Sequence, residues 1–245
     1  MKEEMNPSTP DAAFSRLELV MVLATVGLLA GLALPLLANN KFRSEQVSCL
    51  SNLRQAGHAL HLWANEHGDR NHWWTHIRDG GTYYTPGDPT PTTWSPIDRN
   101  NAWFQWAFIS NELRTPKILV CRADQPKVIA NTFTDFYNLP TFKNGAVSYF
   151  IGLHSFFASP RSILSGDRNV RWGGLNNGCS AQVGLTYTLN VPNSFVRWTN
   201  AIHGTTGNLL FTDGGVEQMS IRGLERAVNF PAQNENGSLH FIVPP

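Results

Sequence analysis

An apolar run near the start of the chain limits what this sequence can fold into more than any other feature. Between residues 17 and 38 the only ionisable side chain is that of Glu18. A helix over residues 14–38 would reach about 38 Å, which exceeds the roughly 30 Å hydrocarbon core of a bilayer. The sequence therefore predicts one membrane-spanning helix. The Glu18 carboxylate requires a partner or a function, because inserting an ionisable group into a membrane as part of a spanning segment costs roughly 3 kcal/mol.

A second pattern extends this helix beyond the apolar run. Apolar side chains recur at steps of four, three, four and three residues, at Cys49, Leu53, Ala56, Leu60 and Trp63. This spacing places them on one face of a helix. We therefore expect an amphipathic helix over residues 39–68 that packs under a globular head, with a bend at Pro35 and a stop near Gly68.

The rest of the chain, residues 69–245, predicts a β-rich head. Residues 71–100 are rich in Gly, Pro, Thr and aromatic side chains without a helical period, which favours a loop with short strands. A short helix is expected at 100–115, an extended segment at 116–124 and a further helix at 221–230. Turn residues separate the expected antiparallel strands, which are 146–153, 162–167, 182–190, 207–214 and 216–221. The predicted class is α+β.

The residues around the apolar run resemble a known processing segment. The stretch "AAFSRLELVMVLATVGLLAGLALP" is similar to that of type IV prepilins and type II secretion pseudopilins, which are cut before a Phe whose new amine is methylated. The resemblance implies a leader at 1–13, a cut between Ala13 and Phe14, and a role for Glu18 as the fifth mature residue. Pro35 matches the position where many pilins kink. Glu18 is then expected to neutralise the Phe14 ammonium of a neighbouring subunit.

The head carries a second resemblance. His203 is followed after nine residues by Asp213 and Gly214, which is similar to the H-X9-DG signature in a large bacterial group of pseudopilin-like proteins. The segments "VSCLSNLRQ", "VCRAD" and "SGDRN" match recurring segments of the same group. The resemblance implies a pilin-like fold, with a long N-terminal helix packed on an antiparallel sheet.

Three cysteines are too few and too widely spaced for a disulfide-rich scaffold or a zinc ribbon. Cys49 lies on the apolar stripe and Cys121 ends an apolar segment, so an oxidising periplasm favours a bridge between them over two buried thiols. Cys179 is expected to be unpaired. A net charge of +1 with mixed signs gives no electrostatic footprint for nucleic acid.

Several possible sites have two readings. His203 and Asp213 either form a metal or catalytic pair, or Asp213 and Gly214 supply a hairpin turn, which is the favoured reading. His58 and His61 are three residues apart on the helix, which is weak evidence for a zinc site. The carboxylates of Asp167, Asp213 and Glu217 are candidate calcium ligands, provided that about six oxygens converge on one point. No other cofactor is expected. The eight Trp residues suit a core better than a glycan-binding face.

Together these observations predict a structural subunit and not an enzyme. The expected protein lies in the bacterial inner membrane with its head in the periplasm, is cut by prepilin peptidase, and assembles through residues 14–38 with copies of itself or other pseudopilins on a secretion or pilus platform. One alternative is an anchored surface or glycan-binding protein that uses the same export route without polymerising. Another is a hydrolase, for which no serine elbow, phosphate loop or HExxH pattern is present.

Overall fold

The chain forms two compact units, Met1–Ser44 and Glu45–Pro245, each described here by itself. The computed structural model describes residues 15–83, 85, 87–88, 98–138, 143–159, 161–173, 186–190, 195–229 and 238–244.

Helix α1, Arg16–Glu66, contains 51 residues and runs through the boundary between the units. It begins with a capping box. The Ser15 N–H donates to Glu18 Oε2 at 2.9 Å, and the Glu18 N–H donates to Ser15 Oγ at 3.2 Å. Two of the amide groups that a helix start leaves without partners are thereby satisfied. Glu18 thus has a local structural role that the sequence pattern did not suggest.

Residues 17–32 of α1 carry large apolar side chains that are exposed to solvent. Their exposed fractions range from 49% at Val22 to 71% at Leu17. Among the helical residues that the structure describes, no helix is both long and apolar enough to cross a membrane. Pro35 lies within the continuous helix, but its side chain is outside the described residues.

The second part of α1 packs into the head as its spacing predicted. The five residues of the apolar stripe are all buried, with exposed fractions of 5% or less. Between them Gly57 allows a close approach, since a Cβ there would lie 2.7 Å from Leu210 Cδ1. The helix ends at Glu66. Two residues later, Gly68 and Asp69 adopt φ values of +69° and 58°, which a right-handed helix does not allow. The expected stop near Gly68 is confirmed.

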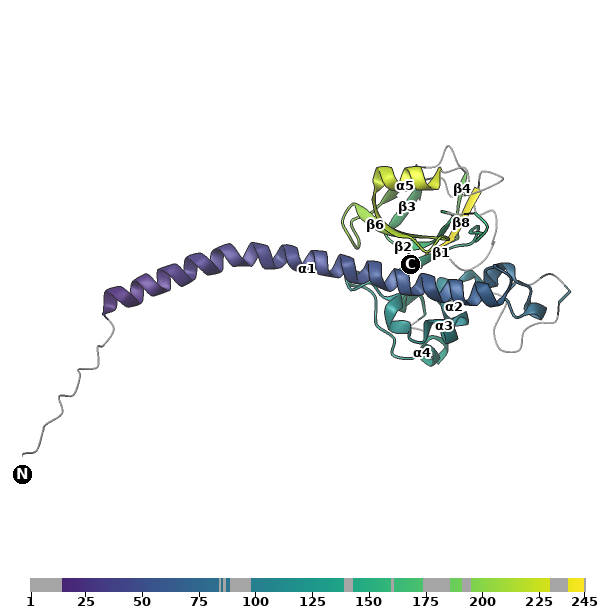
Figure 1. The fold of residues 1–245 in the computed structure, drawn as a ribbon, viewed down its shortest axis with the longest axis horizontal. Helices are drawn as coiled ribbons and strands as arrows, with labels where there is room; N and C mark the ends of the chain where they lie inside the picture. Colours follow the sequence, from purple (N-terminus) through teal and green to yellow (C-terminus); the bar gives the residue numbers. More distant parts are fainter. Residues whose placement is uncertain are drawn as a thin grey trace, which may run out of the picture. The chain divides into compact units, whose positions relative to one another are not determined.

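Short helices make up much of the head (Figure 1). The segment 116–124 was predicted to be extended, but it begins as a 3-10 helix with Pro116 near its start. The Thr115 hydroxyl accepts from the Lys117 N–H at 3.4 Å and caps this turn. In the described part of 71–100 there are 3-10 turns and no named strand. The head helices are η1 (His72–Trp74), η2 (Ile77–Asp79), η3 (Asp98–Asn100), α2 (Ala102–Phe108), α3 (Ser110–Leu113), η4 (Pro116–Leu119), α4 (Phe133–Asn138), η5 (Asn144–Ala146) and α5 (Ile221–Val228).

The strands form a six-stranded antiparallel sheet in the order β4-β8-β1-β2-β6-β7 and a separate antiparallel pair, β3-β5. The sequence predicted β1, β2, β4, β6 and β7 but not β3, β5 or β8. Their bounds are β1 (Tyr149–Gly152), β2 (Ile163–Asp167), β3 (Val170–Gly173), β4 (Thr186–Asn190), β5 (Phe195–Trp198), β6 (Thr206–Phe211), β7 (Val216–Ser220) and β8 (Ser238–Ile242).

Both faces of the large sheet are covered at β1, β2 and β6, whose residues are almost all buried. Tyr149 and Ile151 of β1 pack in one apolar cluster with the stripe of α1 and with α2. Phe150, between them, packs in a second cluster with α5 and β5. Figure 1 shows α5 on one side of the sheet and α2 to α4 on the other. The head is therefore an α+β fold with helices packed on an antiparallel sheet, as expected.

Candidate functional site

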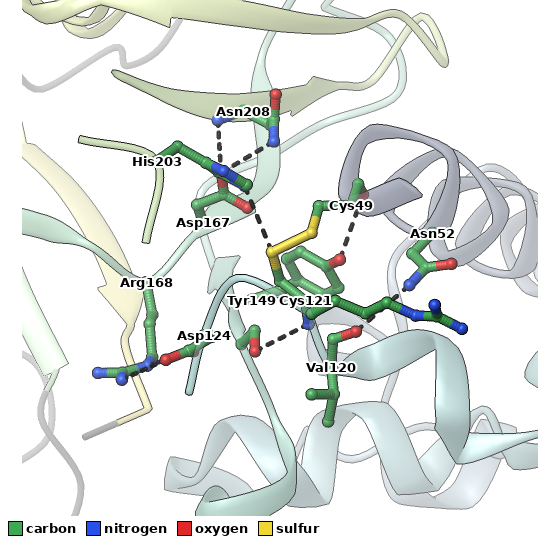
Figure 2. The surroundings of a disulfide bond; sticks show 12 residues. Cys49, Asn52, Val120, Cys121, Asp124, Tyr149, Asp167, Arg168, His203 and Asn208 are labelled. Atoms are coloured by element: carbon green, nitrogen blue, oxygen red, sulfur yellow. Dashed lines mark hydrogen bonds and ion pairs between the residues drawn. A yellow bond between two sulfur atoms is a disulfide. The ribbon is translucent and has the colours of Figure 1, made fainter. Parts of the chain in front are cut away.

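A disulfide joins α1 to the segment after η4, at the centre of a buried polar cluster (Figure 2). Cys49 and Cys121 have an S–S distance of 2.08 Å and a Cα–Cα distance of 4.9 Å. This Cα separation lies within the usual range for such bonds. Both cysteines are fully buried. The structure thus contains the bridge that the apolar stripe and the second cysteine suggested.

Hydrogen bonds hold the backbone on each side of this disulfide. The Tyr149 hydroxyl of β1 donates to the Cys49 carbonyl at 3.2 Å, and the Asn52 amide donates to the Val120 carbonyl at 3.3 Å. The Cys121 N–H donates to Ser148 Oγ at 3.0 Å. Burial raises the pKa of Tyr149 well above its usual value, so its hydroxyl keeps the proton that it donates. The two cysteines are therefore fixed in place by contacts besides the bridge itself.

His203 connects the disulfide to a buried carboxyl group. Its Nε2 atom lies 3.3 Å from Cys121 Sγ and 3.6 Å from Asp167 Oδ2. The same carboxyl oxygen accepts from the Asn208 N–H at 2.8 Å and from the Asn208 side-chain amide at 2.9 Å. The sequence left His203 without an explanation, and the structure places it against the disulfide and not against Asp213.

The burial of this His–Asp pair governs its charge. Burial raises the pKa of Asp167 to about 7, against the opposing effect of the two hydrogen bonds from Asn208. Burial also lowers the pKa of His203. Both directions oppose charge separation, because an ion in an apolar interior loses its hydration. The pair therefore favours the uncharged form over an ion pair.

A true ion pair lies beside this cluster. Arg168, directly after β2, donates to both carboxylate oxygens of Asp124 at 2.7 and 2.6 Å. The Asp124 side chain is fully buried and that of Arg168 is 15% exposed. This two-point geometry is the strongest form of the arginine–carboxylate contact. It fixes the turn after Cys121 to the end of β2.

The two residues of the H-X9-DG pattern lie in different surroundings. His203 is 2% exposed and lies in the buried cluster. Asp213 instead lies in the exposed β6–β7 turn, where its carboxylate accepts from the Gly215 N–H at 2.8 Å. Gly214 adopts a φ of +80° in the same turn. The favoured turn reading agrees with this geometry, and the reading of His203 and Asp213 as a pair is wrong.

The three acidic calcium candidates do not come together. Asp167 is fully buried against Asn208, Asp213 caps its own turn, and Glu217 binds Arg161 at 2.8 Å. In the described ranges, the only group of three possible metal ligands with atoms within 4.8 Å of one another is Cys49, Cys121 and His203. Asp167, Asp213 and Glu217 therefore do not form one calcium site, and that interpretation is wrong.

The histidines of residues 58–76 serve different purposes. His67 stacks on Trp63 with ring centroids 3.7 Å apart, and His76 Nε2 lies 2.8 Å from Asp88 Oδ2. His61 packs against Phe157. The described part of the chain gives His58 and His61 no third ligand. His61 thus packs against the head, whereas His58 is exposed on α1.

Parts of the predicted processing site and one cysteine cannot be compared with the structure. Ala13, Phe14 and Cys179 lie outside the described residues. Glu18 is described, and its carboxylate binds the Ser15 N–H within its own chain. The expected contact between Glu18 and a neighbouring subunit remains a prediction.

No protein-family model, curated protein or solved structure matches this chain. Its function must therefore be argued from the residues and their geometry.

Proposed function

We propose that this chain is a pilin-like structural subunit that is stored in the bacterial inner membrane and assembles through its N-terminal helix into a pseudopilus or a related filament. The observation that carries the proposal is the exposed apolar surface of the first part of α1. The ten large apolar side chains of residues 17–32 that are exposed are Leu17, Leu19, Val20, Met21, Val22, Leu23, Val26, Leu28, Leu29 and Leu32.

Such a surface is too costly to remain in water. Burying a large aliphatic side chain is worth roughly 1.5–3 kcal/mol, so ten of them represent on the order of 15–30 kcal/mol. The residues occupy all sides of the helix, which suits lipid or a bundle of neighbouring helices better than one protein partner. The apolar run continues to Ala38, beyond the side chains that the structure describes.

The hydrogen bonds of Thr25 and Glu18 are consistent with the same environment. Thr25 donates its hydroxyl back to the carbonyls of Met21 and Val22, at 3.0 and 2.8 Å. Its polar group is thus satisfied within the helix, as lipid requires. Glu18 is satisfied by the capping box in the isolated chain. After a cut before Phe14, the same carboxylate would lie close to the end where a new ammonium is created.

Two roles for Glu18 can be separated by two substitutions. Glu18→Gln keeps an amide oxygen that can accept from the Ser15 N–H, but it removes the charge. Glu18→Ala removes both. If neutralising a neighbour's ammonium is the function, both variants should insert normally and both should fail to assemble. If capping is the only function, Glu18→Gln should assemble like the wild type.

The experiment is filament yield from sheared cells, with subunit levels in the membrane held equal. Glu66→Ala, an exposed acidic residue at the other end of α1, is the matched control and should assemble normally. Intact-mass analysis of the envelope fraction should show a chain that begins at Phe14 with a methylated amine. Normal filaments from Glu18→Gln would contradict the charge-pairing account, and retention of Met1 would contradict the filament function.

A second candidate is a glycan-binding surface protein, because Trp74 is exposed between two hollows. Its exposed fraction is 39%, and it lines hollows of about 250 and 220 Å³. Its indole N–H donates to the Leu153 carbonyl at 2.6 Å, which fixes the ring. Phe156 stacks against the ring with centroids 5.7 Å apart, so a sugar would have to stack on the part of the ring that Phe156 leaves exposed. Trp74→Ala should abolish retention on polysaccharide columns, and Leu62→Ala, an exposed residue of α1, should not. Unchanged retention of Trp74→Ala would exclude Trp74 as the binding residue.

A further inference from the structure

The disulfide, His203 and Asp167 form a more specific arrangement than a structural crosslink requires. The ligand atoms of Cys49, Cys121 and His203 all lie within 4.8 Å of one another. A fourth group, the Asp167 carboxyl, lies 3.6 Å from His203 Nε2. These are two sulfurs, one imidazole nitrogen and one oxygen, which are the donors that Zn²⁺ prefers.

Two of the distances between these atoms are close to those of a tetrahedral zinc site. Zinc bonds of about 2.3 Å to sulfur, 2.05 Å to nitrogen and 2.0 Å to oxygen imply separations of about 3.6 Å for S···N and about 3.3 Å for N···O. The structure has 3.3 Å between Cys121 Sγ and His203 Nε2 and 3.6 Å between His203 Nε2 and Asp167 Oδ2. The two sulfurs, bonded at 2.08 Å, are too close, since a zinc site would hold them about 3.8 Å apart. Asp167 is not among the groups whose ligand atoms all lie within 4.8 Å of one another, so its carboxyl group must also move toward the sulfurs.

We propose that the chain with this disulfide reduced binds one Zn²⁺ through four side chains, Cys49, Cys121, His203 and Asp167. The metal then replaces the covalent bond as the link between α1 and the segment after η4. This inference is independent of the filament function, since it concerns the interior of the head.

The chemistry requires one reductant and one metal ion. A dithiol supplies two electrons and two protons, which break the S–S bond and give two thiols, while the dithiol becomes its own disulfide. Each thiol then releases its proton to solvent when its sulfur binds Zn²⁺. His203 binds as a neutral ring through the Nε2 lone pair, and Asp167 binds as a carboxylate. The two sulfurs must separate and the Asp167 carboxyl group must move toward them, and an Asp167 carboxyl group that is protonated releases its proton to solvent.

The surroundings of Asp167 support a ligand role. Asn208 donates twice to Oδ2 and so orients the carboxyl group, as outer residues do around metal sites. The other oxygen, Oδ1, is buried and has no hydrogen-bond partner within the described residues. A buried carboxyl oxygen without a partner is costly. The oxygen near His203 Nε2 is Oδ2, so Oδ1 would reach a metal ion there only after the carboxyl group turns. Figure 2 shows the His203 ring beside this carboxyl group, with a dashed line from the ring to the Cys121 sulfur.

The proposed site has a consequence for how the correct bridge forms. Three cysteines allow three different pairings, and the structure contains the one between Cys49 and Cys121. A zinc ion that holds these two thiolates together before oxidation would keep Cys179 from pairing with either. Release of the metal would then leave the two thiols beside each other, and an external disulfide oxidant that takes up two electrons and two protons would close the bridge.

The test uses the full chain in detergent, unfolded with denaturant and dithiothreitol, and refolded without oxygen after the dithiol is removed. Metal analysis after gel filtration should find one zinc per reduced chain and none per oxidised chain. Cys179→Ser should still bind one zinc, whereas Cys49→Ser and His203→Ala should bind none, and Asp167→Asn should bind more weakly. Co²⁺ in place of Zn²⁺ should give the visible spectrum of a tetrahedral site with a thiolate charge-transfer band.

Three results would overturn the proposal. The first is a reduced chain that refolds, by circular dichroism, without taking up zinc. The second is full zinc binding by Cys49→Ser, or loss of zinc in Cys179→Ser. The third is a reduced chain that does not refold whether or not zinc is present, since the four side chains would then not assemble. Refolding that occurs only with zinc would support the site.

Discussion

The interior histidine His72 makes the stability of the head depend on pH in a way that one substitution should reveal. Its ring is fully buried and stacks on Phe108 with centroids 5.2 Å apart. Trp73 and Trp63 lie at 4.7 and 5.5 Å, both edge-on to the ring. Burial lowers the pKa of His72 to about 3, against a smaller opposing effect of Gln105. His72→Phe would keep an aromatic ring in this cluster and remove the titration.

The expected magnitude follows from the two pKa values. The ring titrates at about 6.5 in the unfolded chain and at about 3 in the folded one. Between these values the unfolded state binds more protons than the folded state. The contribution of His72 to the free energy of unfolding is therefore fully present above pH 6.5 and is lost as the pH falls. From pH 7.5 to pH 5.0 the loss attributable to His72 is roughly 2 kcal/mol.

The assay is urea unfolding of the full chain in detergent at pH 7.5 and pH 5.0, followed by circular dichroism. The wild-type profile alone is not diagnostic, because burial raises the pKa of Asp167 to about 7 and its protonation stabilises the fold as the pH falls. That effect is common to both proteins and cancels in their difference. The larger Phe ring adds an offset of about 1–3 kcal/mol that does not depend on pH.

The result expected is that His72→Phe gains roughly 2 kcal/mol relative to wild type on going from pH 7.5 to pH 5.0. His58→Gln, at an exposed position on α1, is the control and should show no such gain. A difference between wild type and His72→Phe that stays constant within about 0.5 kcal/mol would refute the reasoning, since one buried neutral histidine should then have no effect on the proton balance.

Three further predictions concern the head. Replacing both Cys49 and Cys121 by Ala should lower the free energy of unfolding by about 4 kcal/mol, because the bridge closes a loop over a separation of 72 residues; an unchanged urea midpoint would contradict this. Arg168→Gln should cost about 3–5 kcal/mol by leaving the buried Asp124 carboxylate without its partner, and Asp124→Asn in the same chain should recover part of the loss. Gly207→Ala should lower the melting temperature, because its methyl group would lie 2.5 Å from an indole carbon of β5.

The features that the sequence predicted well depend on neighbours along the chain. The buried stripe from Cys49 to Trp63 was read from a period of three and four residues, which only a helix produces. The β6–β7 hairpin was read from Asp213 and Gly214, because a tight turn needs a residue with positive φ at that point. Local geometry decides both, so no distant contact was needed to infer them.

The features that were missed depend on residues far apart in the sequence. His203 contacts Asp167, from which it is separated by β3, β4 and β5, and Cys121, which is 82 residues away. No local sequence pattern indicates either contact. The run 116–124 was misread because its apolar alternation also suits a 3-10 turn that begins at Pro116. The missing β8 lies after a polar stretch, and its pairing with β1 and β4 is set by the sheet and not by its own residues.

The bond between Cys49 and Cys121 also determines how the head responds to pulling. Tension applied along α1 toward the N-terminus and along the chain after β1 reaches the two cysteines and passes directly across their sulfurs. The segment between them carries no force while the bond is intact. Its 72-residue separation corresponds to about 250 Å of extended chain, which does not contribute to the length of the stretched molecule. In single-molecule stretching, reduction should lengthen the unfolded chain by this amount, whereas the oxidised molecule keeps α2, α3 and η4 free of load.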